Sequence, residues 1–231
     1  MANDDIRFDN PLKQLGFEHD DIIPPGGFGA VMARAGLGKT SVMVQLALSA
    51  MLRGKRVLHI SLDDPVKKIN LWYKELFQLL VGRKSIGPQT GLWESILTKR
   101  FIMALKSNDF NVSKLEKRLT DLADQDIFSP DVIVIDGLLF DESIRHTMLD
   151  LKPLADGYAS CIWFTVHIHR HEPAGPDGLP VQLTGVHDLV DAAILIHAED
   201  KGIMVKKLKG GTASNERESL MIDPSTMLIK A

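Results

Sequence analysis

Largely apolar runs alternate with amphipathic segments along most of this chain. Five of the runs have the length and character of strands buried in a parallel sheet: residues 28–32, 56–62, 101–105, 131–136 and 161–167. The amphipathic segments predict helices over about residues 39–53, 64–80, 113–122 and 142–155. This order predicts an α/β fold, in which a mostly parallel β-sheet is flanked by helices.

The C-terminal part has a different pattern. Residues 192–196, residues 203–209, and Leu220 together with residues 227–229 predict three further strands. Short turns rich in glycine separate them. Strands joined by such turns pair antiparallel, so we expect an antiparallel C-terminal edge on the parallel sheet.

Turn and capping residues predict where several elements begin. Ser113 and the glutamate three residues later have capping-box spacing and predict the start of the third helix. Asp64 and Pro65 suit the capping position and the first turn of the second helix. Glycine and proline are frequent in residues 82–98 and 171–184. We expect loops there, the first with at most one helical turn and the second mobile.

A single domain accounts for the whole chain. Its 231 residues can bury one large core, so we expect one domain over residues 1–231. Residues 1–25 begin polar and acidic and then carry spaced apolar side chains. They predict a segment that packs on the domain edge or on a neighbouring subunit, while residues 26–231 would form the core.

A phosphate-binding loop is the clearest chemical pattern, and it lies between the first strand and the first helix. Its form is small-x-x-x-x-Gly-Lys-Thr, and the expected nucleotide contacts are Ala33, Arg34, Ala35, Gly36, Leu37, Gly38, Lys39, Thr40 and Ser41. A helix that starts at such a loop points free N–H groups at an anion. Lys39 would reach the β and γ phosphates, and Thr40 would bind Mg²⁺. The alternative is a glycine-rich turn that begins an ordinary helix.

Two carboxylates follow predicted strands. Asp136 ends the buried run of residues 131–136, where an acidic side chain has few structural roles. We expect it to hold, through an ordered water, the Mg²⁺ that bridges the phosphates. A cap or turn residue before Gly137 is the alternative. Asp63 follows the strand of residues 56–62 and has no evident structural role.

The order of these patterns resembles the RecA-like P-loop ATPases, above all the motor domain of DnaB-type replicative helicases and the KaiC-type ATPases. The resemblance depends on the phosphate loop, the strand ends at Asp63 and Asp136, and the runs of residues 166–170 and 205–211. It covers nearly all of the chain from about Gly26 onward. It implies a P-loop NTPase that binds ATP and Mg²⁺ and acts in a ring or filament of like subunits.

The resemblance also implies individual roles. Asp63 stands where the family has a glutamate that activates the attacking water, and it is one methylene shorter, which implies a closer water or slow hydrolysis. His167 stands where a polar sensor contacts the γ-phosphate. Lys207 and Lys209 align with a Lys-x-Arg pair that reaches the neighbouring subunit's nucleotide, but lysine lacks the bidentate fork of arginine. With Lys39, these residues form the expected catalytic set.

Other interpretations of these residues remain open. The lysines at positions 206, 207 and 209 suit solvated charges on an edge strand. His167, His169 and His171 alternate, so on a strand they share a face and could bind zinc, although the sequence offers no recognisable fourth ligand.

Composition limits the partners and the compartment. The net charge of −3 gives no general reason to bind nucleic acid, and residues 137–143 and 171–184 contain no lysine or arginine. The single cysteine, Cys161, excludes an intramolecular disulfide and fits a reducing compartment. No apolar run is long enough to span a bilayer and no leader pattern is present, so we expect no membrane partner and a cytoplasmic location.

Three functions remain open from the sequence. The first is a Mg²⁺-dependent ATPase or nucleotide switch that works as a homo-oligomer. The second is a motor driven by single-stranded DNA, which needs basic and aromatic residues in channel-facing loops and is disfavoured by their composition. The third is a regulatory protein that binds ATP with little turnover, and the short carboxylate of Asp63 favours it modestly.

Overall fold

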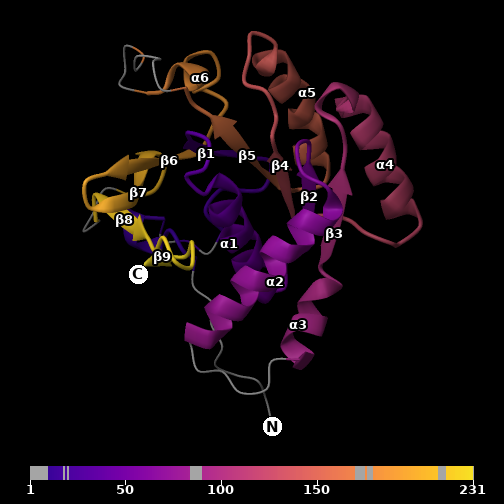
Figure 1. Ribbon diagram of the computed structural model, residues 1–231. Coiled ribbons are helices and arrows are strands. Elements are labelled where there is room, and N and C mark those ends of the chain that lie inside the picture. Colours follow the sequence, from indigo (N-terminus) through magenta and orange to yellow (C-terminus); the bar gives the residue numbers. More distant parts are fainter. Residues whose placement is uncertain are drawn as a thin grey trace.

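One twisted sheet forms the centre of the molecule. The computed structural model describes residues 10–17, 19, 21–83, 90–169, 175, 179–212 and 217–230. Within these residues, nine strands form a single sheet in the order β3-β2-β4-β5-β1-β6-β7-β8-β9 (Figure 1). The strands from β3 to β6 in this order run parallel, and the last three add an antiparallel edge.

The parallel strands coincide closely with the apolar runs of the sequence. They are β1 (Phe28–Ala33), β2 (Val57–Ser61), β3 (Arg100–Ala104), β4 (Val132–Asp136), β5 (Cys161–His167) and β6 (Ala192–Glu199). The antiparallel edge contains β7 (Gly202–Lys209), β8 (Ser219–Ile222) and β9 (Ile229–Lys230). The predicted mostly parallel sheet with an antiparallel C-terminal edge is therefore confirmed.

The prediction of one last strand from Leu220 and residues 227–229 is wrong, because the structure has two strands there, β8 and β9. A turn interrupts it, closed by a hydrogen bond of 2.7 Å from Met227 N to the Asp223 carbonyl. Met227 has a φ of 58°, in the left-handed region that reverses the chain direction. The chain then returns antiparallel as β9.

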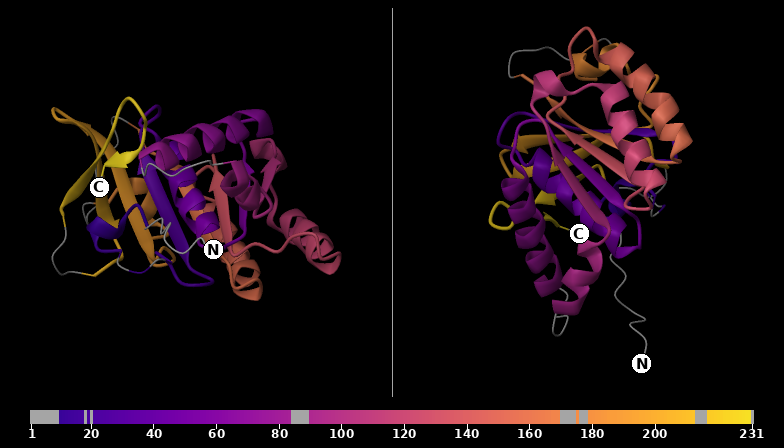
Figure 2. Two further views of the ribbon diagram at one scale, coloured as in Figure 1. Left: turned by 90° about the horizontal axis from the view of Figure 1, so that it is seen from below. Right: turned by 90° about the vertical axis from the view of Figure 1, so that its right-hand side faces the viewer.

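Helices cover both faces of the sheet. α1 (Lys39–Leu52), α2 (Val66–Arg83) and α3 (Thr90–Leu97) pack on one face, and α4 (Val112–Asp124), α5 (Ile144–Gly157) and α6 (Val181–Thr184) pack on the other. Short 3₁₀ turns occur at Lys13–Leu15 and Ser107–Asp109. The right-hand view of Figure 2 shows the sheet between the two helical layers. None of the helices in the described ranges is long and apolar enough to cross a membrane.

Two of the predicted loops contain helix. α2 continues through Arg83 and α3 spans two turns, so the prediction of at most one turn in residues 82–98 is wrong. The rings of Phe77 and Trp93 lie 4.9 Å apart, and this packing gives α3 an apolar face despite its glycine. Part of the loop predicted over residues 171–184 is the short helix α6. Most of the remainder lies outside the described residues.

The start of α4 also differs from the prediction. Asn111, rather than Ser113, is the capping residue, and its side chain accepts a hydrogen bond of 3.0 Å from Lys114 N. The helix therefore begins at Val112, and the predicted capping box does not form. Asparagine is as good a capping residue as serine, so the residue two positions earlier in the chain satisfies the first helical turn.

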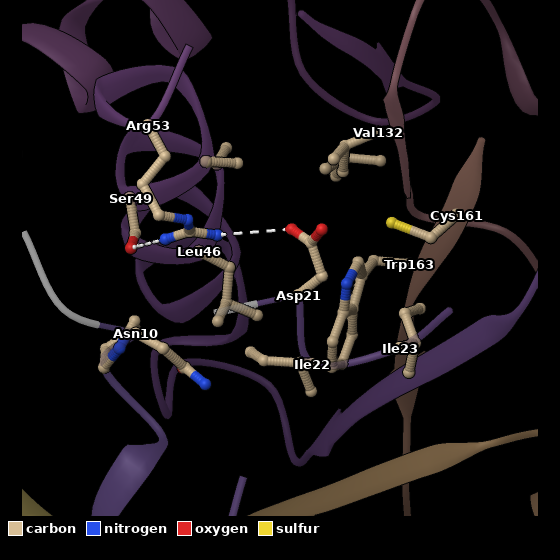
Figure 3. A pocket seen from close by; sticks show the side chains of 14 residues that line it. Asn10, Asp21, Ile22, Ile23, Leu46, Ser49, Arg53, Val132, Cys161 and Trp163 are labelled. Atoms are coloured by element: carbon tan, nitrogen blue, oxygen red, sulfur yellow. Dashed lines mark hydrogen bonds and ion pairs between the residues drawn. The ribbon is translucent and has the colours of Figure 1, made fainter. Parts of the chain in front are cut away.

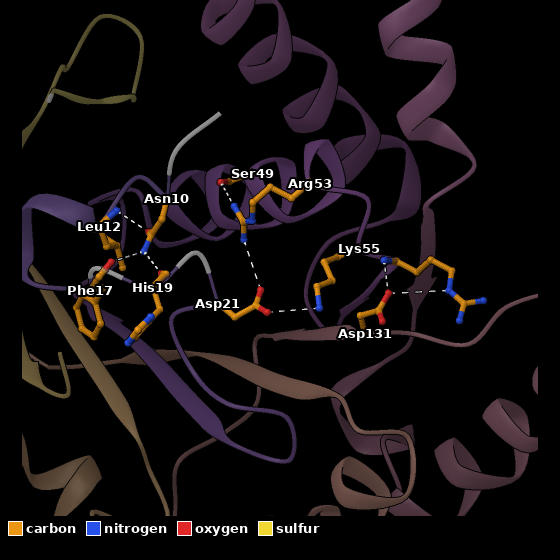
Figure 4. Close-up of polar contacts among 10 residues, drawn as sticks. Asn10, Leu12, Phe17, His19, Asp21, Ser49, Arg53, Lys55 and Asp131 are labelled. Carbon is orange, nitrogen blue, oxygen red and sulfur yellow. Dashed lines mark hydrogen bonds and ion pairs between the residues drawn. The ribbon is translucent and has the colours of Figure 1, made fainter. Parts of the chain in front are cut away.

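The N-terminal segment packs against α1. Leu12, Leu15 and Phe17 are buried in the same apolar cluster as α1. Asn10 Nδ2 donates to the carbonyls of Phe17 and His19 at 2.8 and 3.1 Å, which folds the segment back on itself (Figure 4). These contacts give the apolar side chains of the segment a place in the core of their own chain.

Asp21 joins this segment to the end of α1 above a small cavity. Its carboxylate lies 3.9 Å from Arg53 (Figures 3 and 4) and 3.4 Å from Lys55 (Figure 4). The cavity beneath it has a volume of about 30 Å³, which is room for a single water molecule. Cys161 lies on its wall, and burial raises the pKa of this thiol to about 12. The thiol therefore stays protonated, and the cavity is too small for a substrate.

Candidate functional site

The carboxyl ends of β1, β2, β4 and β5 lie together along one edge of the sheet. This carboxyl edge runs across the ends of the strands, and is not the antiparallel edge formed by β7, β8 and β9. The register pairs Ala33 with His167 and Ser61 with Asp136, so these four strand ends lie side by side. In open α/β sheets, ligands bind just outside this edge. The structure thus brings the residues of the predicted phosphate loop together with Asp63, Asp136 and His167.

The loop after β1 turns on two glycines. Gly36 and Gly38 have φ angles of 77° and 96°, which other residues adopt only with strain. Gly38 precedes the first residue of α1 and has no side chain with which to cap the N–H groups of the first helical turn. Arg34, Ala35 and Gly36 are exposed. The loop therefore presents uncapped backbone donors to solvent at the positive end of α1, as an anion site requires.

Lys39 lies across this loop. Its Nζ donates to the carbonyls of Ala33 and Arg34 at 3.1 and 3.3 Å. Burial lowers the pKa of Lys39, and the negative charges of Asp136 and Asp63 act in the opposite direction. The ammonium group is thus held inside the loop, close to two carboxylates, where it can contact a phosphate oxygen.

Thr40 and Asp136 meet directly. The Thr40 hydroxyl donates to Asp136 Oδ2 at 3.0 Å, although 96 positions separate the two residues in sequence. A hydroxyl has one proton, so this bond leaves the lone pairs of Thr40 Oγ1 available to a cation. Hydroxyl and carboxylate oxygens are hard ligands of the kind that Mg²⁺ prefers, with waters and phosphate oxygens completing its octahedron. The donor set present here fits that ion.

Asp63 lies over the backbone of Gly137. A Cβ atom added to Gly137 would lie 2.5 Å from Asp63 Oδ2, so the close approach needs the glycine. Burial raises the pKa of Asp63, the charges of Asp136 and Asp64 raise it further, and Lys39 and His167 lower it. Asp63 is therefore electrostatically coupled to both the lysine and the strand-end carboxylate.

Asp64 has a different environment from its neighbour. Its carboxylate accepts a hydrogen bond of 2.8 Å from Lys68, one turn into α2. α2 begins at Val66, and the Pro65 carbonyl accepts from the N–H groups of the first turn. Asp64 therefore pairs with a lysine instead of capping the helix as predicted, and Asp63 is the carboxylate that faces the site.

The structure places the two histidines of the β5 end beside each other. The rings of His167 and His169 lie 4.8 Å apart, and both side chains are exposed. Arg170 and His171 lie outside the described residues, so the alternative of a zinc site on three histidines is not described in full. Among the residues that are described, no group of three His, Cys, Asp or Glu side chains could hold a metal ion.

The two predicted catalytic lysines lie on β7, away from the loop. Lys209 pairs with Ala193 and Lys207 with Ile194, near the amino end of β6. Both lysines therefore lie toward the amino ends of the parallel strands, whereas the phosphate loop lies at their carboxyl ends. The amino group of Lys207 donates to the Thr212 carbonyl at 3.0 Å, and that of Lys209 donates to the His187 carbonyl. Neither lysine is near the phosphate loop of its own chain.

Ser41 belongs to the scaffold behind the loop. Its buried hydroxyl donates to the Met227 carbonyl at 2.7 Å, and Gln45 Nε2 donates to the same carbonyl at 3.0 Å. The amide N–H of Ile229 donates in turn to Gln45 Oε1 at 2.9 Å. These bonds fasten the C-terminal turn to α1, and they bring the Met227 side chain against Gly38.

Sequence reasoning missed Thr165. This buried residue of β5 donates to Asp136 Oδ1 at 2.6 Å and accepts a hydrogen bond of 3.0 Å from Gly137 N. The signal available in the sequence was a single hydroxyl inside the apolar run of residues 161–167. Its strand position, two residues before His167, puts both side chains on the same face.

No protein-family model and no curated protein matches this chain. The functional assignment below therefore depends on the geometry of this edge of the sheet.

Proposed function

We propose that this chain is a RecA-like P-loop ATPase or nucleotide switch that binds ATP with Mg²⁺ at the carboxyl edge of its sheet. The observation that supports this best is the 3.0 Å hydrogen bond from the Thr40 hydroxyl to Asp136, beside the glycine loop. An uncapped helix start, a lysine inside the loop and two metal-compatible oxygens meet there. An ordinary glycine turn before a helix would need none of these partners.

The proposed mechanism works by positioning and charge neutralisation. The loop N–H groups and Lys39 would hold the β and γ phosphates. Thr40 directly, and Asp136 through an ordered water, would hold the metal ion, which would withdraw charge from the phosphate oxygens. Asp63 orients a water toward the γ-phosphorus and accepts its proton. The new P–O bond forms as the bond to the ADP oxygen breaks. His167 donates a hydrogen bond to the γ-phosphate and so distinguishes ATP from ADP.

We further propose that the active form is a homo-oligomer. Lys207 and Lys209 cannot serve the nucleotide of their own chain, because they lie toward the opposite edge of the sheet. In a ring or filament they would approach the phosphate loop of the next copy and stabilise charge there.

Calorimetry and steady-state hydrolysis test the proposal. Wild-type protein is expected to bind MgATP, and Lys39→Ala to lose binding or turnover. Asp63→Ala is expected to lose turnover and keep binding. The matched control is Asp64→Ala, which removes the neighbouring carboxylate that pairs with Lys68. Asp64 acts on Asp63 only through its charge, so this variant should reduce turnover far less than Asp63→Ala.

Two results would overturn the proposal in different ways. No heat on titration of MgATP into the wild type would exclude the nucleotide site. Hydrolysis by Asp63→Ala at the wild-type rate would exclude Asp63 as the water-activating group. Light scattering with a slowly hydrolysed ATP analogue measures the oligomer, and strong stimulation of hydrolysis by single-stranded DNA would select a motor function instead.

A further inference from the structure

We infer that Thr165 is a positioning residue that fixes the carboxylate of Asp136 for metal binding. The inference rests on the proposed function, because it assigns a further residue to the same site. It depends on a hydrogen-bond chain from Gly137 N through the Thr165 hydroxyl to Asp136 Oδ1, with distances of 3.0 and 2.6 Å.

The direction of this chain is determined by its ends. A backbone N–H only donates, so Thr165 Oγ1 must accept from Gly137. The hydroxyl proton is then left for Asp136 Oδ1, and a hydroxyl bonded to a carboxylate at 2.6 Å is a short, charge-assisted contact. The residue after Asp136 thereby holds the hydroxyl in the rotamer that points at Asp136.

Both oxygens of Asp136 are engaged by hydroxyl groups. Thr165 on β5 bonds Oδ1, and Thr40 on α1 bonds Oδ2. The carboxylate plane is therefore fixed from two sides, and rotation about the Cβ–Cγ bond would break both bonds at once. Groups that orient the ligands of a metal are commonly held by such partners, whose loss costs about 10–100-fold in metal affinity.

The positive charge of Lys39 is a competing partner for the Asp136 carboxylate. This competition explains why the bond from Thr165 is needed besides the bond from Thr40. Lys39 is close enough for the Asp136 charge to raise its pKa against the effect of burial. With Oδ1 released, the Thr40 hydroxyl would be the one remaining hydroxyl partner of the carboxylate, and the positive charge of Lys39 would compete with it for Asp136. Thr165 is almost fully buried, so no water replaces its hydroxyl without rearrangement of β5.

Ser160, which directly precedes β5, provides a matched control at the far end from Thr165. Its buried hydroxyl donates to the Pro130 carbonyl at 2.7 Å, which links the residues before β5 and β4 at the edge opposite the site. Removing either hydroxyl breaks a buried bond between the same two segments. Only the loss of Thr165 is expected to affect the metal.

The test measures ATP affinity by calorimetry twice, once with Mg²⁺ and once with EDTA, and takes the ratio of the two affinities. A general loss of folded protein lowers both affinities alike, so the ratio reports the contribution of the metal ion to binding. We expect Thr165→Val to reduce the wild-type ratio about 10- to 100-fold, Thr165→Ser to restore it, and Ser160→Ala to leave it unchanged. Thermal melting of each variant reports on folding, and Thr165→Ala, which adds no volume, replaces the valine variant if that one does not fold.

The outcomes separate this inference from the proposed function. An unchanged ratio in Thr165→Val, or a ratio lowered equally by Ser160→Ala, would overturn the positioning role while the nucleotide site stands. A wild type that binds ATP in neither condition would overturn the proposed function itself.

Discussion

Acidification should weaken the fold through one buried histidine. His59 on β2 is fully buried, and its Nδ1 lies 3.0 Å from the Tyr73 hydroxyl. Burial lowers the pKa of His59 to about 3, and the nearby charge of Arg100 contributes in the same direction. Its Nε2 has no hydrogen-bond partner among the described residues, so an imidazolium there would bury an unpaired N–H.

The magnitude follows from proton linkage. In the unfolded chain His59 titrates near its ordinary pKa of about 6.5. Between that pH and about 3 the unfolded state binds up to one more proton than the folded state, so stability falls as the pH falls. The free energy of unfolding decreases by up to about 1.4 kcal/mol per pH unit, and by about 1.6 kcal/mol in total from pH 6.5 to pH 5, because the unfolded histidine is already half protonated at pH 6.5. The contribution becomes constant about one pH unit above 6.5.

Urea unfolding followed by tryptophan fluorescence at several pH values between 7.5 and 5 measures this loss. The comparison is with His59→Gln, which keeps a polar group opposite Tyr73 but does not titrate. The variant is expected to be less stable at neutral pH and to lose about 1.6 kcal/mol less stability than the wild type from pH 6.5 to pH 5. Parallel curves for the two proteins would refute the reasoning, because all other titrating groups are common to both.

Three further changes test the site and its scaffold. Gly137→Ala should cost about 1–2 kcal/mol in a melting experiment, because φ is +93°, and should slow hydrolysis, because its Cβ displaces Asp63. Asp63→Glu should raise steady-state turnover with MgATP affinity unchanged, because it supplies the methylene that Asp63 lacks; an unchanged or lower rate would contradict this prediction. Gln45→Leu should destabilise the protein by about 1–3 kcal/mol in urea, because it leaves the buried Met227 carbonyl and Ile229 N–H with fewer partners. A midpoint like that of the wild type would contradict that estimate.

The parallel strands of the sheet were predictable because each corresponds to a largely apolar run in the sequence. A strand buried on both faces needs a continuous apolar run, and residues 161–167 predict β5 to the residue. Helix ends were less predictable, since Asn111 and Ser113 are both good capping residues and the choice between them depends on tertiary packing. α3 was missed because its stability comes from the contact of Trp93 with Phe77 on another helix.

The candidate site was predictable where chemistry and sequence position coincide. Asp63, Asp136 and the glycine loop each follow a strand, and parallel strands end at the same edge. Thr165 was not predictable, because a single hydroxyl in an apolar strand gives no indication of its partner across the sheet. Its role depends on the register between β4 and β5, which only the structure provides.

The fastening of α1 to the C-terminal turn has a consequence for biosynthesis. Ser41 and Gln45 bond to Met227 and Ile229, which lie 186 and 184 positions later in the chain. On the ribosome, these two side chains of α1 can bond only to each other until almost all of the chain has been made, because the Met227 carbonyl and the Ile229 N–H come so late. The helix that begins at the glycine loop is therefore expected to reach its final packing late, and a nascent chain lacking β9 should be a substrate for chaperones.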